Sequence, residues 1–222
     1  MNEINNPKIT VIIPAHNEDA YIARCLRSLI SQTFQKELYQ IIVINDGSTD
    51  KTIEILETFK SDIEIINNTK KIGLPASLNK AILDTETKYF VRVDADDYVS
   101  VNFLKYLYDF MSKNLYIDAI ACDYNIIDDN ETLISRKNCM EDPIACGILF
   151  NTRQIVDIGL YDETFQIWEE KDLRIRFLEK HSIYRLELPL YRYRKHESNI
   201  TNNKKESDFF MNKLILKHQK NK

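Results

Sequence analysis

Glycine is scarce in this sequence of 222 residues, which has only four, so a glycine-rich phosphate-binding loop is not available. The four cysteines, Cys25, Cys122, Cys139 and Cys146, show no CxxC spacing, which argues against a zinc site and favours reduced thiols. No apolar run approaches the ~18 residues that a membrane-spanning helix needs. The polar residues 1–8 do not resemble a signal peptide. We therefore expect a cytoplasmic protein.

An excess of positive charge is also missing. The net charge of −4 at pH 7 gives no electrostatic basis for binding nucleic acid. The chain is 44% hydrophobic and 29% charged, which is ordinary for a soluble globular protein. No repeat, low-complexity linker or change in composition divides it. We therefore expect a single domain over residues 1–203, followed by a basic tail over 204–222.

Apolar runs alternate with segments of helical periodicity in the first half of the chain. The expected strands are 9–13, 41–44, 63–66 and 89–93, and the expected helices between them are 19–32, 51–60 and 75–83. This alternation predicts an α/β fold whose central sheet is mostly parallel, with helices on both faces.

The second half of the chain is less regular. We expect a hairpin whose strands, 118–127 and 133–135, flank a polar turn. Further along, the pattern predicts a strand at 145–150, a short helix at 152–158 that stops at Gly159, a helix at 170–180, and two strands, 183–186 and 190–193, separated by Pro189. A helix at about 101–111 precedes the hairpin, and another begins at about residue 207.

Three carboxylates, Asp94, Asp96 and Asp97, follow directly on the strand at 89–93. Like charges this close repel each other, and a divalent cation with a preference for oxygen ligands, Mg²⁺ or Mn²⁺, relieves the repulsion. Ligands bind at the carboxyl ends of strands in open α/β sheets, which is where these acids fall. The alternative is a solvated acidic loop that caps the next helix.

Four blocks give the sequence a resemblance to glycosyltransferase family 2. They are 11–18 (VIIPAHNE), 43–50 (VINDGSTD), 92–97 (RVDADD) and 191–196 (YRYRKH) with Asn199 and Thr201. Together they span about residues 9 to 201 in the order that the family has. The resemblance implies a GT-A fold and inverting transfer of a sugar from a nucleotide-diphosphate donor to a hydroxyl group.

The first two blocks are similar to the family's nucleotide-binding turns. The resemblance implies that Pro14, Ala15, His16 and Glu18 contact the nucleoside. It also implies that Asp46 accepts a hydrogen bond from the N3–H of uracil, so we expect a UDP-sugar as donor. The alternatives are a polar turn in which Glu18 caps the next helix, and an Asx turn at Asp46.

The third and fourth blocks imply a metal site for Mn²⁺ or Mg²⁺. Asp96 would be the direct ligand and His196 a further one, because a neutral imidazole suits Mn²⁺. Asp94 would face the ribose or its phosphates. Asp97 would support the site from behind or cap the following helix.

Two arginines in these blocks, Arg92 and Arg194, are counted with the substrate-binding residues. Arg192 and Arg194 share a face of their strand, so one or both would meet phosphate. A solvent-exposed face of salt bridges explains the two strand arginines equally well.

The catalytic base is expected in the stretch 168–176 (WEEKDLRIR). The family has a Glu-Asp pair before a Leu-x-x-Arg helix, and its Asp is the base. Here Glu170 takes the Asp position, and Asp172 is a nearby rival. Trp168 would stack on an acceptor sugar, or it is simply a core side chain. The base would take the proton from the acceptor hydroxyl during a single inverting displacement.

The acceptor is expected to be a glycan or a lipid-linked molecule, as in the synthesis of bacterial surface polysaccharide or lipopolysaccharide. One alternative function is a nucleotidyltransferase, against which the absence of a glycine-rich loop counts. Another is a sugar-binding subunit that has lost catalysis, for which the Glu at the base position is the only support.

The tail 204–222 carries six lysines against Glu206 and Asp208, a local balance of +4. Phe209, Phe210, Leu214 and Ile215 recur near helical spacing, which predicts a basic amphipathic helix. Its apolar face would pack on the domain or on a second copy of it. The alternative is peripheral contact with an anionic membrane, where a lipid-linked acceptor would lie.

Overall fold

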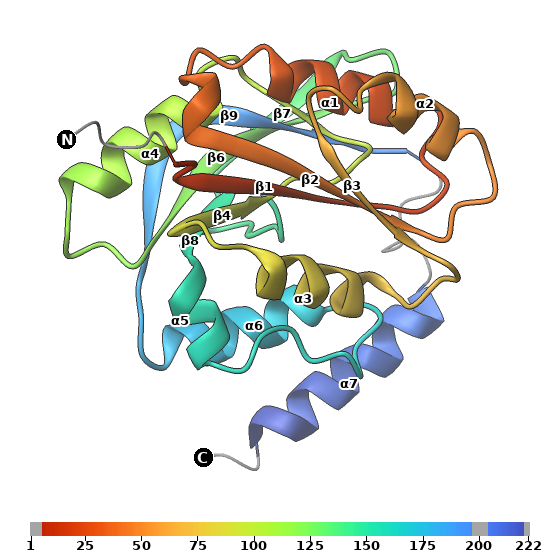
Figure 1. The fold of residues 1–222 in the computed structure, drawn as a ribbon. Coiled ribbons are helices and arrows are strands. Elements are labelled where there is room, and N and C mark those ends of the chain that lie inside the picture. The colour runs from red at the N-terminus through yellow and green to blue at the C-terminus, as the bar shows by residue number, and fades with distance from the viewer. Residues whose placement is uncertain (1–5, 197–203, 220–222) are drawn as a thin grey trace.

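A computed structural model describes residues 6–196 and 204–219 of the chain. Within these ranges the strands form one nine-stranded sheet of order β3-β2-β1-β4-β8-β6-β9-β5, with β7 beside β6 (Figure 1). Asn199 and Thr201, which belong to the fourth sequence block, lie outside the described residues.

The first half of the chain forms the predicted parallel unit. Its strands are β1 (Ile9–Ala15), β2 (Tyr39–Asp46), β3 (Glu64–Asn68) and β4 (Tyr89–Arg92), and its helices are α1 (Ile22–Ile30), the 3₁₀ turn η1 (Lys36–Leu38), α2 (Thr52–Thr58) and α3 (Leu74–Asp84). Strand β1 pairs in parallel with both β2 and β4, and β2 pairs in parallel with β3. The alternation of strands and helices is therefore confirmed.

The second half of the chain completes the sheet with mixed pairing. Its elements are β5 (Tyr98–Val99), α4 (Phe103–Lys113), β6 (Ala119–Ile127), β7 (Leu133–Lys137), β8 (Ile148–Asn151), α5 (Thr152–Asp157), α6 (Glu169–Leu178) and β9 (Ile183–Arg194). Strand β8 is antiparallel to both β4 and β6, whereas β9 runs parallel to β6. The hairpin of β6 and β7 is confirmed, but β5 was not predicted, because two residues are too short to show a period.

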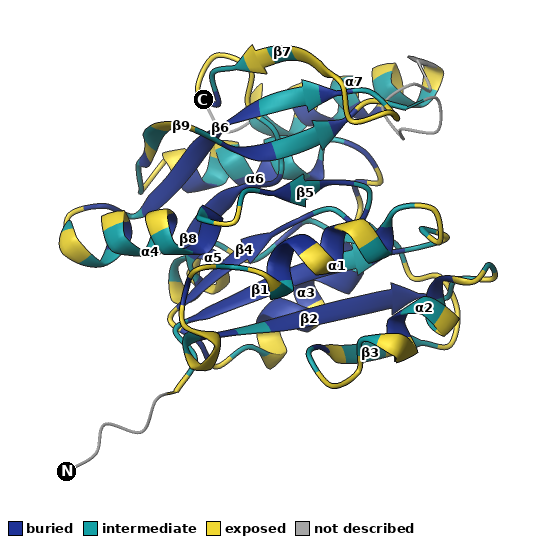
Figure 2. Cartoon of the chain, turned by 90° about the horizontal axis from the view of Figure 1, so that it is seen from above, coloured by how far each residue is buried: buried dark blue, intermediate teal, exposed yellow. Residues whose placement is uncertain are grey.

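Alternating side chains of the parallel strands feed two hydrophobic cores. Ile9, Val11 and Ile13 of β1 pack with buried side chains of α1 and α4 on one face. Ile12 faces the other side, where α3, α5 and α6 contribute the apolar partners. Figures 1 and 2 show the result: buried central strands lie between helices whose outer faces are exposed. All four cysteines are buried and free.

The prediction of two strands separated by Pro189 is wrong, because β9 is continuous from Ile183 to Arg194. Pro189 lies opposite Asp123 of β6, where the register between the two strands shifts. A proline has no N–H to donate to a neighbouring strand, and a local irregularity accommodates it without ending the strand.

The tail forms helix α7 (Lys204–Gln219), which begins three residues before the predicted start. Phe210 and Leu214 are buried in a small core with Phe165 and Ile167, so these two residues of the predicted apolar face pack on the domain. The other two, Phe209 and Ile215, are 65% and 43% exposed. Among residues 6–196 and 204–219 we find no helix that combines the length and the hydropathy of a membrane span.

Candidate active site

A cleft of about 680 Å³ lies between the carboxyl ends of β1, β2 and β4 and the start of α6. Eleven of the residues predicted from the sequence line it: Pro14, Ala15, His16, Glu18, Asp46, Arg92, Asp94, Asp96, Trp168, Glu170 and His196. Three further candidates, Asp172, Arg192 and Arg194, are not part of its wall. Carboxyl ends of adjacent parallel strands meet at one edge of a sheet, which is why residues so distant in sequence converge here.

Hydrogen bonds join the turn after β1 to the turn after β2. His16 Nδ1 lies 2.8 Å from the backbone oxygen of Asp46. The amide oxygen of Asn17 accepts from the backbone N–H of Thr49 at 2.8 Å, and the N–H of Asn17 donates to Ser48 Oγ at 3.0 Å. The two turns predicted to bind the nucleoside therefore form one connected wall of the cleft.

The Asp46 carboxylate holds the loop that precedes α3. It accepts from the backbone N–H groups of Ile72 at 2.8 Å and Gly73 at 2.9 Å, and from the side chain of Asn68 at 3.0 Å. Burial opposes the ionisation of Asp46, but these donors outweigh it, and the pKa of Asp46 is lowered. The neighbouring Gly47 has φ +67, and a Cβ there would lie 2.7 Å from the backbone of Lys70. Asp46 thus has a structural role in addition to the predicted base recognition.

The acidic turn after β4 is anchored by a buried arginine. Arg92 Nε donates to Asp94 Oδ1 at 2.7 Å, and its Nη1 donates to Glu169 Oε1 at 3.0 Å. Both Arg92 and Glu169 are less than one-tenth exposed. Arg92 therefore joins the Asp94 turn to the first residue of α6.

Asp96 and His196 meet at the cleft, although β4 and the end of β9 lie far apart in sequence. His196 Nε2 lies 2.9 Å from Asp96 Oδ2, and the His196 ring packs on Tyr21 with a centroid separation of 5.1 Å. A carboxylate oxygen and an imidazole nitrogen at this separation are a donor set that suits Mn²⁺.

Negative charge accumulates around this pair. Burial, followed by repulsion from Asp96 and Asp94, raises the pKa of Glu18 to about 8. Burial and Asp94 also raise the pKa of Asp96, although His196 opposes this. A cation bound between these carboxylates would relieve the repulsion.

A second group of potential ligands, Asp94, Asp97 and Cys146, has donor atoms within 4.8 Å of one another. Asp97 accepts hydrogen bonds from the Tyr191 hydroxyl and the Arg194 backbone N–H, both at 2.7 Å. Asp97 is 2% exposed and does not line the cleft. Protein donors thus already occupy Asp97, and the Asp96 and His196 pair, which lines the cleft, is the better candidate for a metal site.

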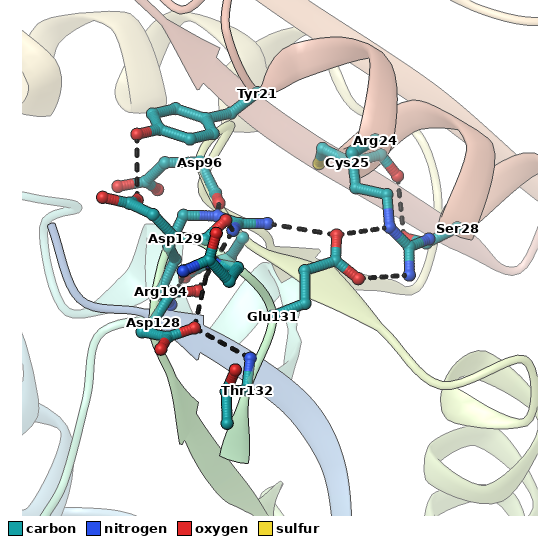
Figure 3. Close-up of polar contacts among 12 residues, drawn as sticks. Tyr21, Arg24, Cys25, Ser28, Asp96, Asp128, Asp129, Glu131, Thr132 and Arg194 are labelled. Atoms are coloured by element: carbon teal, nitrogen blue, oxygen red, sulfur yellow. Dashed lines mark hydrogen bonds and ion pairs between the residues drawn. The ribbon is translucent and has the colours of Figure 1, made fainter. Parts of the chain in front are cut away.

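Arg194 binds the β6–β7 turn instead of facing the cleft (Figure 3). Its guanidinium donates to the backbone oxygens of Asp96 at 3.0 Å, Asp128 at 3.3 Å and Asp129 at 3.2 Å. It also lies 3.5 Å from Glu131, which pairs with Arg24 of α1 at 2.9 Å. Arg194 therefore supports the Asp96 turn from behind, and its position lends no support to phosphate binding.

The two candidates for the base lie in different environments. Burial, with repulsion from Glu169, raises the pKa of Glu170 to about 7 at the edge of the cleft. Asp172 is fully buried and contacts Arg176, Lys217 and His218, and its pKa is lowered. A base must reach the acceptor hydroxyl, so the geometry favours Glu170 over Asp172.

Trp168 lines the cleft and also packs on the small core that contains α7. Its Nε1 donates to the backbone oxygen of Ser207 at 3.0 Å, and Lys171 Nζ lies 3.5 Å from the ring centroid. The two alternatives foreseen for Trp168, a cleft residue and a core residue, are thus compatible.

Two charged residues of the cleft wall, Glu169 and Lys71, were not predicted as site residues. Glu169 binds Arg92, and its only signal in the sequence was its place beside Glu170. Lys71 lines the cleft beside Gly47 and brings a positive charge there. Its position depends on the loop that Asp46 holds, which the sequence did not reveal.

Comparison with known proteins finds relatives both by sequence and by structure. Residues 10–168 match the model of glycosyl transferase family 2. An uncharacterized glycosyltransferase of Haemophilus influenzae is 38% identical over 130 residues, which cover 57% of this chain and 40% of that protein. The poly(ribitol-phosphate) beta-glucosyltransferase of Bacillus spizizenii is 39% identical over 48% of this chain and 18% of its own length. The chain thus spans less than half of these relatives.

Solved structures share the fold at low sequence identity. Staphylococcus aureus TarS 1-349 in complex with UDP-GlcNAc superposes with a TM-score of 0.76 and 21% identity over 88% of this chain and 61% of that one. The mannosyltransferase PcManGT from Pyrobaculum calidifontis, in complex with GDP-Man and Mn²⁺, gives 0.75 and 13% over 97% and 65%. The GT-A-type fold expected from the sequence is therefore confirmed.

Proposed function

Because the chain belongs to glycosyltransferase family 2, we propose that it is an inverting, metal-dependent glycosyltransferase that uses a UDP-sugar and glycosylates a hydroxyl group. The observation that carries the proposal is the composition of the cleft. Acids at the end of β4, the joined turns after β1 and β2, and Glu170 all line the same space.

Glu170 supplies the base in this proposal. It removes the proton from the acceptor hydroxyl while that oxygen forms a bond to the anomeric carbon. The bond from that carbon to the diphosphate oxygen breaks on the opposite side, so the nucleoside diphosphate leaves and the configuration inverts. A base with a pKa of about 7 has a proton affinity suited to work near neutral pH.

Asp96 and His196 would hold the cation, since their donor atoms meet at the cleft wall. When bound, Mn²⁺ or Mg²⁺ neutralises the charge that develops on the diphosphate as the sugar leaves. Arg92 keeps Asp94 oriented, and Arg194 braces the Asp96 turn through its backbone oxygen. The complex of the structurally similar mannosyltransferase contains Mn²⁺, which supports Mn²⁺ as the ion in this proposal.

The names of the relatives support a more specific proposal. One is a beta-glucosyltransferase and another a beta-N-acetylglucosaminyltransferase, both acting on poly(ribitol-phosphate). A structural neighbour holds UDP-GlcNAc. We therefore favour a hexosyl or N-acetylhexosaminyl donor and an acceptor hydroxyl on a bacterial surface polymer or its lipid-linked precursor.

Incubation with a panel of nucleotide sugars, with and without Mn²⁺, tests the proposal. Metal-dependent release of nucleoside diphosphate is the expected result, and product analysis should give the inverted configuration. Release of pyrophosphate would indicate a nucleotidyltransferase instead. Binding of a nucleotide sugar without turnover on any acceptor would indicate a sugar-binding subunit.

A further inference from the structure

We propose that helix α7 is part of the active site's framework, and that Asp172 is a positioning residue through which α7 fixes Glu170. The proposal rests on the proposed function in so far as Glu170 is the base. The segment predicted as a separate tail thus has, over residues 204–219, a structural role in catalysis.

Asp172 lies at the centre of a charge cluster that joins α6 to α7. Lys217 Nζ lies 2.6 Å and His218 Nε2 lies 2.9 Å from Asp172 Oδ1. Arg176, one turn further along α6, lies 2.8 Å from Asp172 Oδ2. Lys217 also contacts Asp162 at 2.8 Å. Both partners on one oxygen of Asp172 thus come from α7.

A buried carboxylate depends on its partners, because a charge without them is costly in a protein interior. Asp172 is 0% exposed. Arg176 is not a dedicated partner of Asp172, because its guanidinium also donates to the backbone oxygens of Ile158 and Leu160. Loss of Lys217 and His218 would therefore leave the buried charge of Asp172 poorly compensated, which should destabilise the start of α6.

The same helix holds the segment that leads into α6. Lys213 Nζ donates to the backbone oxygen of Thr164, and Trp168 Nε1 donates to the backbone oxygen of Ser207. Phe210 of α7 packs in the small core with Phe165. Contacts with α7 therefore recur along residues 162–172, on both sides of Glu170.

Trp168 has a backbone conformation that needs such support. Its φ of +68 lies in the left-handed region, which is unfavourable for a bulky side chain. It immediately precedes α6, so its conformation sets the direction in which Glu169 and Glu170 leave the segment. The hydrogen bond to Ser207 ties this strained residue to α7.

The charged groups around Glu170 come from α6 and β4. They are Glu169, Lys171 and Arg92, and Arg174 shares a small cavity with Glu170. Burial is the main cause of the raised pKa of Glu170. If α7 detaches, water reaches this end of the cleft, and the pKa of Glu170 should fall towards its ordinary value.

The test compares Lys217→Met with Lys205→Met in the full chain. Both substitutions remove one lysine charge from α7, but Lys205 is exposed whereas Lys217 contacts two buried or half-buried acids. Trp168 is the only tryptophan of the protein, so quenching of its fluorescence by acrylamide reports directly on the contact with α7. We expect more quenching in Lys217→Met than in the wild type. Quenching in Lys205→Met and in Lys217→Arg should equal that of the wild type.

Kinetics separate positioning from a general loss of folded protein. Lys217→Met should lower kcat by up to ~10²-fold, the scale for a small displacement of a catalytic group, with the KM for the donor unchanged. The acidic limb of its kcat profile should move to lower pH. A smaller folded fraction would reduce kcat without moving that limb. Lys217→Arg should restore both.

Equal quenching in Lys217→Met and Lys205→Met would overturn the proposal. Greater quenching in Lys217→Met with an unchanged kcat and pH profile would also overturn the proposal. Helix α7 would then hold residues 162–172 without positioning Glu170. If the wild type transferred no sugar, the proposed function would fail separately. Hydrogen exchange across residues 162–172 would then still decide whether α7 holds this segment.

Discussion

Replacing Asp46 by asparagine should destabilise the protein even when no nucleotide is bound. The carboxylate accepts from Ile72 and Gly73 on one loop and from the Asn68 side chain. An asparagine in the same place has one acceptor oxygen and one NH₂ group. If the amide oxygen still accepts from the Ile72 N–H and the Asn68 side chain, the NH₂ group faces the N–H of Gly73. Two donors then meet, and the hydrogen bond from Gly73 is lost.

The size of the effect follows from the one lost bond. A hydrogen bond to a charged group contributes about 1.5–3 kcal/mol, and Asp46 is almost completely buried, so little water replaces it. For a chain of this length each kcal/mol lowers Tm by about 2–4 °C, which gives a shift of about 3–12 °C. Asp46→Ala, which removes all three bonds, should cost more.

The effect should depend on pH in a defined direction. The pKa of Asp46 is lowered by folding from 3.8. Its contribution to stability is therefore present above that value and is lost as the pH falls through the lower folded pKa. The difference in unfolding free energy between wild type and Asp46→Asn should be full at pH 7 and shrink below about pH 4.

Thermal and urea unfolding without ligand measure this difference, and Asp84→Asn at the exposed end of α3 is a matched control. If Asp46→Asn unfolded like the control and only raised the KM for the donor, Asp46 would be a base-recognition residue without the role in the loop. A loss in both measurements would support both roles.

The remaining predictions concern the cleft acids. Asp96→Ala should keep the fold and abolish metal-dependent release of nucleoside diphosphate, and retained activity, or indifference of the wild type to a chelator, would exclude this metal site. Glu170→Gln should lower turnover by ~10²-fold or more with donor binding little changed, and wild-type kcat should rise with pH through about 7. Near-normal turnover in Glu170→Gln would show that Glu170 is not the base. The raised pKa of Glu18 means that its contribution to stability is lost as the pH rises from 4.5 to about 8. In Glu18→Gln, Tm measured across this pH range should fall less steeply than in the wild type. An unchanged dependence of Tm on pH would show that folding does not raise the pKa of Glu18.

The sequence was sufficient for the fold where local pattern and tertiary environment agree. Buried parallel strands such as β1 and β2 are continuous apolar runs, and their flanking helices have a clear apolar face. The prediction failed at β9, because a proline usually interrupts a strand and only the bulge opposite β6 accommodates it here. It missed β5 because two residues carry no periodicity.

The site was predictable to the level of turns but not of individual contacts. Residues at the ends of β1, β2 and β4 reach the cleft because parallel strands share one edge. Arg194 and Asp172 stand near the same motifs, yet their partners lie 63 residues before and 45 residues after them, at Glu131 and Lys217. A charged residue beside a motif has the same local pattern whether it faces a ligand or a distant ion partner.

The balance of charge in the cleft bears on how the donor binds. Arg92, the buried cation of this wall, is already shared by Asp94 and Glu169. Burial raises the pKa of both Glu18 and Asp96, and repulsion adds to it, from Asp96 and Asp94 at Glu18 and from Asp94 at Asp96. A diphosphate bound here, as the proposed function requires, would add further negative charge to the cleft, and like charges close together disfavour each other. The donor and the divalent cation should therefore bind with positive coupling, each raising the affinity of the other by the same factor. Titration calorimetry that gave equal donor affinity with and without Mn²⁺ would contradict this account of the site.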